Sequence, residues 1–310
     1  MNHNSIGSAA VEPLVAHSEA LAAIVEQVGA STVAVRGRRH AVASGVVWQA
    51  GLVVTAAHVF RRTPAAVTLV GAEGRSVEAA LVGIDSSTDL ALFRIAGETG
   101  PAPVRIGDAA GLRAGHFAMA VGRSAEGDAL ASAGLVNRVG GAWQTWLGGS
   151  VDRLIRLDGG VYDGLSGAPV ADASGAVIGI ATAALSRGYG IVVPAATVSR
   201  VVAALLANGH VARPWLGIGA QPVPLPSPAA DDTGLLISSL APKGPAERAG
   251  LLIGDIVVRA EGEPAGDLHG LRRTLASHVG KTATLSILRG GTPRDLQVEV
   301  GEWPTERRCH

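Results

Sequence analysis

The sequence predicts a mostly β fold arranged as two domains. Its 310 residues include 42 glycines and 16 prolines, and 47% of the residues are hydrophobic, which is typical of short buried strands joined by tight turns. β-branched apolar runs bounded by such turns recur along most of the chain. A chain of this length has room for two domains that each bury a hydrophobic core.

The first domain opens with a predicted amphipathic helix over residues 17–29, and we expect residues 1–16 before it to be flexible. Ser18 suits the N-cap of this helix and Gly29 suits its C-terminal cap. The apolar residues between the two caps recur at helical spacing, so one stripe of the helix is expected to cover the surface of the domain.

Two groups of strand-like runs follow and predict two β-barrels. The first group ends near residue 95, and the turn-rich residues 96–115 separate it from the second. A helical pattern over residues 196–209 closes the domain. The runs are at 32–35, 45–47, 67–70 and 91–95 in the first barrel and at 116–121, 154–157 and 176–180 in the second.

Three residues of this domain fit the mechanism of a nucleophilic serine. His58 ends an apolar run, Asp89 precedes another, and Ser166 lies between glycines in residues 162–170. A serine attacks a carbonyl when a base removes its proton and a third group orients that base. The order His58, Asp89, Ser166 and its spacing are those of a double-barrel serine protease. Asp85 is a rival for the acid, and Asp89 is preferred because a Leu-Ala-Leu strand follows it directly.

The glycines beside Ser166 permit positive φ angles, which lets backbone amides converge on one point. The N–H groups of Gly164, Leu165 and Ser166 are therefore the predicted oxyanion hole. Taken alone, the stretch also fits an ordinary turn between strands. An α/β-hydrolase elbow would need a helix after the serine, and residues 171–175 form a hairpin turn instead.

These motifs make the chain resemble the HtrA/Deg family of trypsin-like serine proteases with a C-terminal PDZ domain. The resemblance rests on residues 55–59, 88–92 and 164–169 and extends over roughly residues 20–301. It implies a chymotrypsin-like fold of two β-barrels followed by a PDZ domain, which is an α+β, partly open barrel. It also implies a serine endopeptidase that cleaves unfolded or misfolded polypeptides through His58, Asp89 and Ser166 without a cofactor.

The resemblance divides the chain into a protease domain over residues 17–209, a linker over 210–214, a PDZ domain over 215–301 and a tail over 302–310. Residues 215–218 resemble the loop with which PDZ domains capture the terminal carboxylate of a peptide, here a hydrophobic C-terminal peptide. The bound peptide would add a strand to a sheet edge. Residues 267–279 supply the groove helix, whose leucines fit either core packing or groove lining. The expected binding residues are Trp215, Leu216, Gly217 and Ile218 in the loop and Leu271 and Leu275 in the helix.

Several residues depart from the family pattern. Leu165 stands where relatives usually have asparagine, so a polar anchor of the turn is lost, and Ala168 stands where they have glycine, which would disfavour a positive φ there. These changes leave open a catalytically impaired peptide-binding or chaperone-like protein on the same architecture. Tyr189 replaces a smaller apolar residue beside the expected substrate pocket. Relatives commonly trimerise through N-terminal aromatic residues, whereas no aromatic residue precedes Trp48, so a trimer follows from the resemblance alone.

Composition argues against several other classes of protein. Lys plus Arg and Asp plus Glu number 26 each, so no charge imbalance indicates nucleic-acid binding. Residues 41–60 lack charged side chains, but their polar residues and a turn near residue 50 favour two strands over an integral membrane segment. No paired Cys and His spacing predicts a metal site, and the single Cys309 excludes an intrachain disulfide.

The N-terminal residues lack the basic and apolar segments of a secretory signal. The expectation is a cytoplasmic protein, or a periplasmic or secreted one whose targeting segment is missing from this chain.

Overall fold

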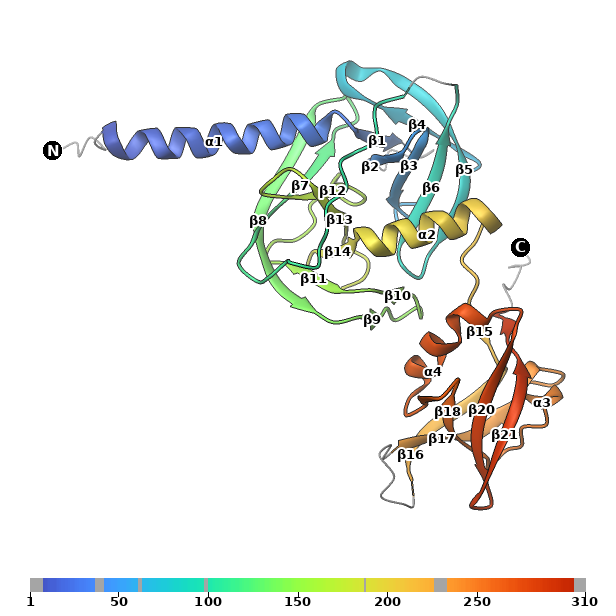
Figure 1. The fold of residues 1–310 in the computed structure, drawn as a ribbon. Coiled ribbons are helices and arrows are strands. Elements are labelled where there is room, and N and C mark those ends of the chain that lie inside the picture. Colours follow the sequence, from blue (N-terminus) through green and yellow to red (C-terminus); the bar gives the residue numbers. More distant parts are fainter. Residues whose placement is uncertain are drawn as a thin grey trace. The chain divides into compact units, whose positions relative to one another are not determined.

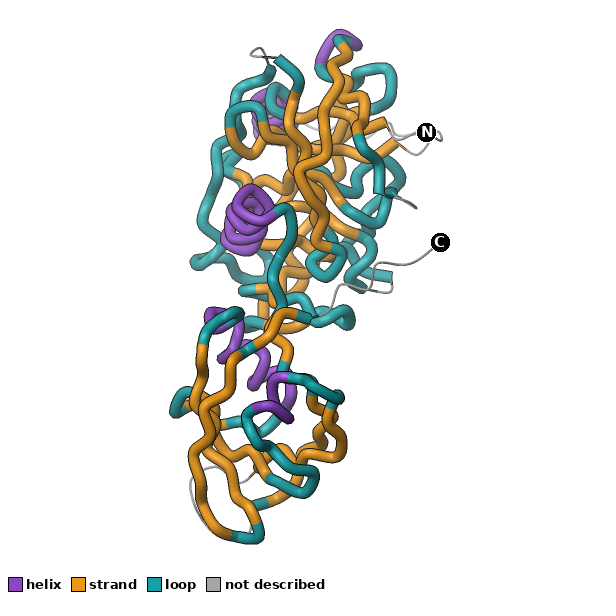
Figure 2. The backbone as a smooth tube through the Cα atoms, turned by 90° about the vertical axis from the view of Figure 1, so that its right-hand side faces the viewer, coloured by secondary structure: helices purple, strands orange, loops and turns teal. Residues whose placement is uncertain are grey.

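The computed structural model describes residues 8–36, 42–60, 63–97, 100–186, 188–225 and 233–303, so Cys309 lies outside the described residues. The chain divides into two compact units, residues 1–211 and 212–310, and each has a hydrophobic core of its own. Strands dominate both units, and the predicted mostly β fold is confirmed (Figures 1 and 2).

Helix α1 spans Ser8–Gly29, so it begins well before residue 17 and includes residues that we expected to be flexible. Pro13 lies inside it. Near its C-terminal end, Ile24 and Val28 are buried, whereas Leu14 and Val15 are 65% and 52% exposed. Leu21 and Val25 are half-buried against the same core, so the stripe predicted for residues 17–29 covers the barrel surface as expected. Figure 1 shows the N-terminal part of the helix, before the predicted range, extending away from the barrels.

The first β-barrel is a closed antiparallel sheet with the strand order β1-β2-β3-β6-β5-β4. Its interior is apolar and includes Val33, Val47, Val53 and Phe93. The strands are β1 (Thr32–Arg36), β2 (Val42–Gln49), β3 (Leu52–Ala56), β4 (Ala66–Val70), β5 (Ser76–Asp85) and β6 (Leu90–Ile95), with a short 3₁₀ helix η1 (Ala72–Gly74). The uncharged stretch near residue 50 thus forms β2 and β3, as the turn between them predicted. No helix in the described ranges is long and apolar enough to cross a bilayer.

The second barrel is also closed, in the order β11-β14-β13-β12-β7-β8. Helix α2 (Ala195–Asn208) packs Val198, Val201 and Leu205 into the core shared by the two barrels and ends at Gly209 in the left-handed conformation. The barrel strands are β7 (Phe117–Arg123), β8 (Ala129–Gly140), β11 (Leu154–Leu157), β12 (Pro169–Asp172), β13 (Val177–Thr182) and β14 (Ile191–Pro194), and a hairpin of β9 (Trp143–Gln144) and β10 (Ser150–Val151) lies between β8 and β11.

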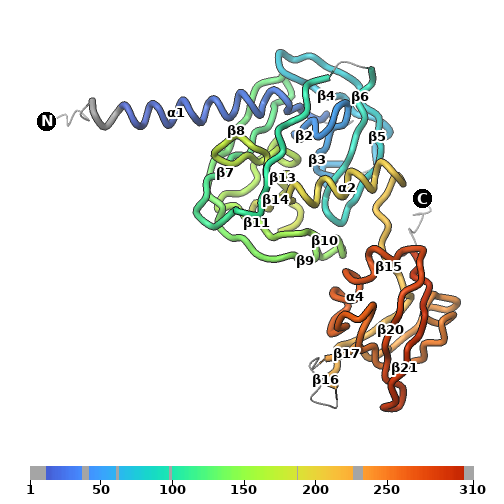
Figure 3. Tube along the Cα trace, in the orientation of Figure 1, coloured from blue at the N-terminus to red at the C-terminus, as the bar shows by residue number. Residues whose placement is uncertain are grey.

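The second unit is built on an antiparallel sheet ordered β16-β17-β18-β20-β21 (Figure 3). Its groove helix α4 (Leu268–Leu275) is shorter than expected, because a 3₁₀ turn η2 (Ala276–His278) ends it. Asp267 caps α4 by accepting from the amides of His269 and Gly270. The other elements are β15 (Pro214–Trp215), β16 (Ile218–Pro224), β17 (Thr233–Leu240), α3 (Pro245–Arg248), β18 (Ile256–Ala260), β19 (Glu263–Pro264), β20 (Thr282–Arg289), β21 (Thr292–Glu299) and β22 (Gly301–Glu302).

The two ends of this unit pair with each other. Pro214 and Glu302 are register partners in the sheet of β15 and β22, and Trp303 N–H donates to the carbonyl oxygen of Arg213 at 2.8 Å. The family resemblance predicts a linker at Pro214 and a tail at Glu302. Both assignments are wrong at these positions, because the pairing gives their backbone groups partners inside the unit.

Candidate active site

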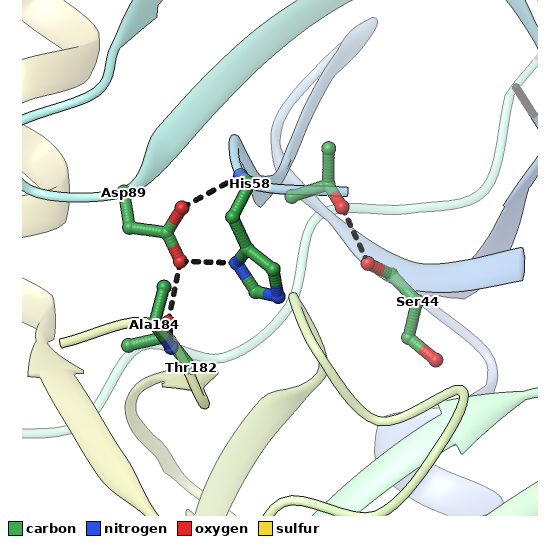
Figure 4. A network of polar contacts seen from close by, with 6 residues as sticks. Ser44, His58, Asp89, Thr182 and Ala184 are labelled. Carbon is green, nitrogen blue, oxygen red and sulfur yellow. Dashed lines mark hydrogen bonds and ion pairs between the residues drawn. The ribbon is translucent and has the colours of Figure 1, made fainter. Parts of the chain in front are cut away.

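His58 and Asp89 are held together where β3 ends and β6 begins (Figure 4). His58 Nδ1–H donates to Asp89 Oδ2 at 2.7 Å, and the backbone N–H of His58 donates to Asp89 Oδ1 at 2.7 Å. The Asp89 residue is 3% exposed and takes a positive φ of 60°. A carboxylate that fixes Nδ1 as the donor leaves Nε2 of the ring unprotonated, which is the atom a general base uses.

Asp85 has a different role from Asp89. Its Oδ1 accepts from the amide and the hydroxyl of Ser87 at 3.1 and 2.6 Å, and its Oδ2 accepts from the hydroxyl of Thr88 at 2.7 Å. These bonds shape the buried turn that leads to Asp89. The structure therefore places Asp89, and not its rival, against the imidazole.

Thr182 is a site residue that sequence analysis missed. Its hydroxyl donates to Asp89 Oδ2, and it accepts the Ala184 amide at 3.0 Å (Figure 4). Because Thr182 ends β13 of the second barrel, the carboxylate is held from both barrels. The only local signal was a hydroxyl residue at the end of a buried apolar run.

Ser166 lies in a turn before β12, between two glycines with positive φ, Gly164 at 85° and Gly167 at 84°. A Cβ on Gly167 would stand 2.2 Å from the carbonyl oxygen of Ser44 and 2.7 Å from the amide nitrogen of Ala56. The turn therefore packs against β3 two residues before His58, and only glycine fits there. Ala168 has no positive φ and its amide donates to Leu165 O at 3.1 Å, so the expected conflict at Ala168 does not arise.

The turn has fewer candidate oxyanion donors than predicted. The Leu165 amide donates to the carbonyl oxygen of Tyr162 at 3.0 Å, so the expectation that it faces a substrate oxygen is wrong. By contrast, the amides of Gly164 and Ser166 donate to no acceptor among the described residues. Two converging donors are the usual number in an oxyanion hole of this kind.

Leu165 anchors the turn through its side chain. The residue is 4% exposed and packs in the core of the second barrel, with Val136 and Ile155. The polar anchor expected from the family pattern is thus replaced by burial of an apolar side chain, which contributes about 2 kcal/mol for a residue of this size.

The nucleophile and the base are not hydrogen-bonded to each other in this structure. Within the described ranges, no hydrogen bond joins Ser166 Oγ to His58 Nε2. Such bonds are often long in enzymes without substrate and shorten in the complex. The described residues also include no group of three or more His, Cys, Asp or Glu side chains placed to hold a metal ion.

The second unit contains a groove between its N-terminal loop and α4. Trp215, Leu216, Gly217 and Ile218 lie on one side, with Leu271 and Leu275 opposite. All six residues that sequence analysis singled out therefore line it. Leu271 and Leu275 are 2% and 1% exposed and belong to the core as well, so the two roles weighed for these leucines coexist.

Four further residues line the groove, namely Pro214, Leu268, Arg272 and Trp303. Trp303 lines the groove from the segment that we had assigned to a tail, and Arg272 of α4 lies over its ring, with the guanidinium carbon 5.4 Å from the ring centroid. The indole is 47% exposed, so it offers an apolar surface to a ligand.

An ion pair in the second unit lies outside the groove lining. Arg289 donates through Nε and Nη2 to the two carboxylate oxygens of Asp255, at 2.8 and 2.7 Å, and lowers the pKa of that carboxyl below its usual value. Asp255 also accepts the amide of Leu252. This pair joins the start of β18 to the end of β20 and stabilises the fold of the unit.

A histidine oriented by a buried carboxylate, beside a serine turn with two unengaged amides in a double β-barrel, defines the class of trypsin-like serine peptidases. Comparison with known families agrees, since residues 43–180 match the trypsin-like peptidase domain and residues 214–300 match the PDZ domain.

Similar curated proteins are named as serine endoproteases of the DegP-like type. The chain is 33% identical over 269 residues to a probable periplasmic serine endoprotease DegP-like of Bartonella henselae, and 33% identical over 288 residues to one of Brucella suis. These alignments cover 83% and 87% of the chain but 52% and 55% of the relatives, so the chain spans about half their length.

Solved structures share the fold. The HtrA-type protease AlgW with tripeptide has a TM-score of 0.76 and 26% identity, covering 93% of this chain and 98% of that one. A serine endoprotease from Yersinia pestis has a TM-score of 0.75 and 24% identity, covering 91% of this chain and 97% of that one. The chain belongs to the HtrA family.

Proposed function

We propose that this chain is a serine endopeptidase that cleaves unfolded or misfolded polypeptides, with a PDZ groove that binds hydrophobic C-terminal peptides. The observation that carries the proposal is the His58–Asp89 pair, whose imidazole is oriented beside a turn that presents Ser166. Protease function of the DegP-like relatives supports it, although the chain spans only about half of their length.

The reaction follows from the geometry of these residues. Ser166 Oγ bonds to the carbonyl carbon of the substrate while His58 Nε2 takes the hydroxyl proton. The electron pair moves to the carbonyl oxygen, which the amides of Gly164 and Ser166 stabilise as an oxyanion. When the C–N bond breaks, His58 returns the proton to the leaving amine, and water then hydrolyses the acyl-enzyme by the same route in reverse.

Asp89 keeps the imidazole in the productive tautomer and stabilises its positive charge while the proton is on the ring. Thr182 in turn orients the carboxylate by donating to Asp89 Oδ2. An acid held from both barrels couples the base to the relative position of the two halves of the domain.

In the second unit, the groove recognises a peptide terminus through its loop and its apolar lining. The amides of Leu216 and Gly217 donate no hydrogen bond within the described ranges, so they are available to a terminal carboxylate. A peptide strand would pair with β16, and its last side chain would lie against Leu271 and Leu275. One structural relative is described as the HtrA-type protease AlgW with tripeptide.

Labelling with a fluorophosphonate probe tests the enzymatic assignment. The native chain is expected to be labelled and to degrade an unfolded protein, and Ser166→Ala is expected to lose both activities while remaining folded. Stronger labelling in the presence of a peptide with a hydrophobic C-terminus would support regulation through the groove. A folded native chain that is not labelled, but binds unfolded protein, would support the chaperone-like alternative.

The family resemblance also predicts a homotrimer. Light scattering of the native chain measures its mass directly, and a monomer over the working concentration range would contradict this part of the proposal.

A further inference from the structure

Ser44 of β2 contacts the nucleophile turn with both its backbone and its side chain. Its amide donates to the carbonyl oxygen of Ser166 at 3.0 Å, and its hydroxyl donates to the carbonyl oxygen of Gly164 at 2.6 Å. The second of these bonds is the dashed line from Ser44 in Figure 4. One residue of the first barrel therefore holds the carbonyl groups of both residues whose amides form the candidate oxyanion hole.

The Ser44 hydroxyl is itself fixed in place. The residue is completely buried, and its Oγ accepts the amide of Arg123 at 3.0 Å. Because Oγ accepts from this amide, its own hydrogen is directed to Gly164 O. The side chain of Arg123 donates to the carbonyl oxygens of Gly29, Thr32 and Gly127, so the strand that carries this amide is anchored as well.

The fold leaves space for this contact. A Cβ on Gly122 of β7 would lie 2.5 Å from Ser44 Oγ and 2.7 Å from Leu165 Cδ2. A side chain at position 122 would therefore displace either the hydroxyl or the Leu165 anchor. The absence of a Cβ there lets the hydroxyl reach the turn.

The contact determines the orientation of one peptide plane. The carbonyl of Gly164 and the amide of Leu165 belong to the same planar unit. Ser44 holds its oxygen, and Tyr162 O accepts its N–H at 3.0 Å. Gly164 has φ 85° and no side chain, so without these two bonds the plane could rotate at little cost. The Gly164 amide lies in the peptide plane before this one and the Ser166 amide in the plane after it. Rotation of the plane between them therefore changes the direction of one amide relative to the other.

We propose that Ser44 is a positioning residue of the oxyanion hole, which acts by holding the Gly164 carbonyl. This proposal rests on the proposed peptidase function. A positioning role and a purely structural role predict different effects of removing the hydroxyl on stability and on the catalytic rate. A structural hydroxyl would change stability alone. A positioning hydroxyl changes the rate of the chemical step, because the oxyanion exists only after the serine has attacked.

The test compares Ser44→Ala with Thr32→Val in the full chain. Thr32 is also buried in the first barrel, and its hydroxyl donates to Val28 O at 2.9 Å without touching the turn. Both variants lose one buried hydroxyl hydrogen bond, so similar losses of thermal stability are expected. For Ser44→Ala, kcat on a peptide substrate should fall about 10- to 100-fold with little change in KM, somewhat less than losing a donor outright. For Thr32→Val, both constants should stay within about twofold of the native values, a margin of about 0.4 kcal/mol.

The result that overturns the proposal is a folded Ser44→Ala variant with the native kcat, or an equal loss of kcat in Thr32→Val. Recovery of kcat in Ser44→Thr, which keeps a hydroxyl at this position, would support it further. Crystal structures of the native chain and Ser44→Ala give a readout that does not depend on activity. The plane between residues 164 and 165 should reorient in the variant, and an unchanged turn would overturn the positioning role even if the native chain proved inactive. Inactivity of the native chain itself would refute the proposed function instead.

Discussion

Replacing Asp89 by asparagine tests the arrangement of the base most directly. Asp89 accepts from the amide of His58, from His58 Nδ1 and from the hydroxyl of Thr182. An asparagine that keeps its oxygen on the His58 amide must place its NH₂ group where Oδ2 was. That group donates to Nδ1, so the ring carries its proton on Nε2 and cannot accept one from Ser166.

The expected loss in kcat is about 10⁴-fold, as found when the same change is made in a Ser-His-Asp triad. It corresponds to about 5.5 kcal/mol at 1.36 kcal/mol per factor of ten. The backbone bond from His58 to Oδ1 survives the substitution, so the turn should stay folded. Steady-state cleavage of a fluorogenic peptide at neutral pH measures the loss, and circular dichroism checks the fold.

Asp85→Asn is the matched control. Asp85 is as buried as Asp89 and accepts from Ser87 and Thr88, but it does not contact the imidazole. We expect it to lower the thermal stability and to reduce kcat less than about tenfold, that is by less than about 1.4 kcal/mol. If the two variants lose activity equally, or if Asp89→Asn keeps more than a tenth of native kcat, the assignment of Asp89 is wrong.

Three further predictions concern the turn and the second unit. Gly167→Ala should abolish cleavage and lower the melting temperature, since its Cβ would lie 2.2 Å from Ser44 O at a positive φ; native activity would refute the packing of the turn. Trp303→Ala should weaken binding of a hydrophobic C-terminal peptide several-fold, by calorimetry, with kcat of the peptide-free enzyme unchanged, because the indole lines the groove. Asp255→Asn should cost about 1.5–3 kcal/mol at pH 7 in denaturant unfolding, since the carboxylate pairs with Arg289. That cost should shrink as the pH falls below about 4, because a carboxyl whose pKa is lowered by folding stabilises the fold only while it is ionised; an equal cost at pH 3 would contradict the role of the pair.

The sequence by itself determined the features that depend on local patterns. Apolar runs and turn residues predicted the barrel strands, and the glycines around Ser166 predicted a turn with positive φ angles. Short local motifs also identified His58 and Asp89, because a few neighbouring residues are enough to show the residue type and its position at the end of a strand. Their direct hydrogen bond then required only that both strand ends meet.

Tertiary structure decided which groups complete the site. Ser44 contacts Gly164 across 120 positions of the chain and Thr182 contacts Asp89 across 93. No local pattern encodes such a contact, because a hydroxyl acquires its role from the partner that the fold places beside it. The same holds for Leu165, whose amide bonds within the turn while its side chain is buried in the second barrel. Trp303 joins the groove because β15 and β22 pair, although these strands come from the first and last residues of the second unit's sequence. Short sequence motifs thus identify the reacting groups, and long-range packing determines the geometry on which their chemistry depends.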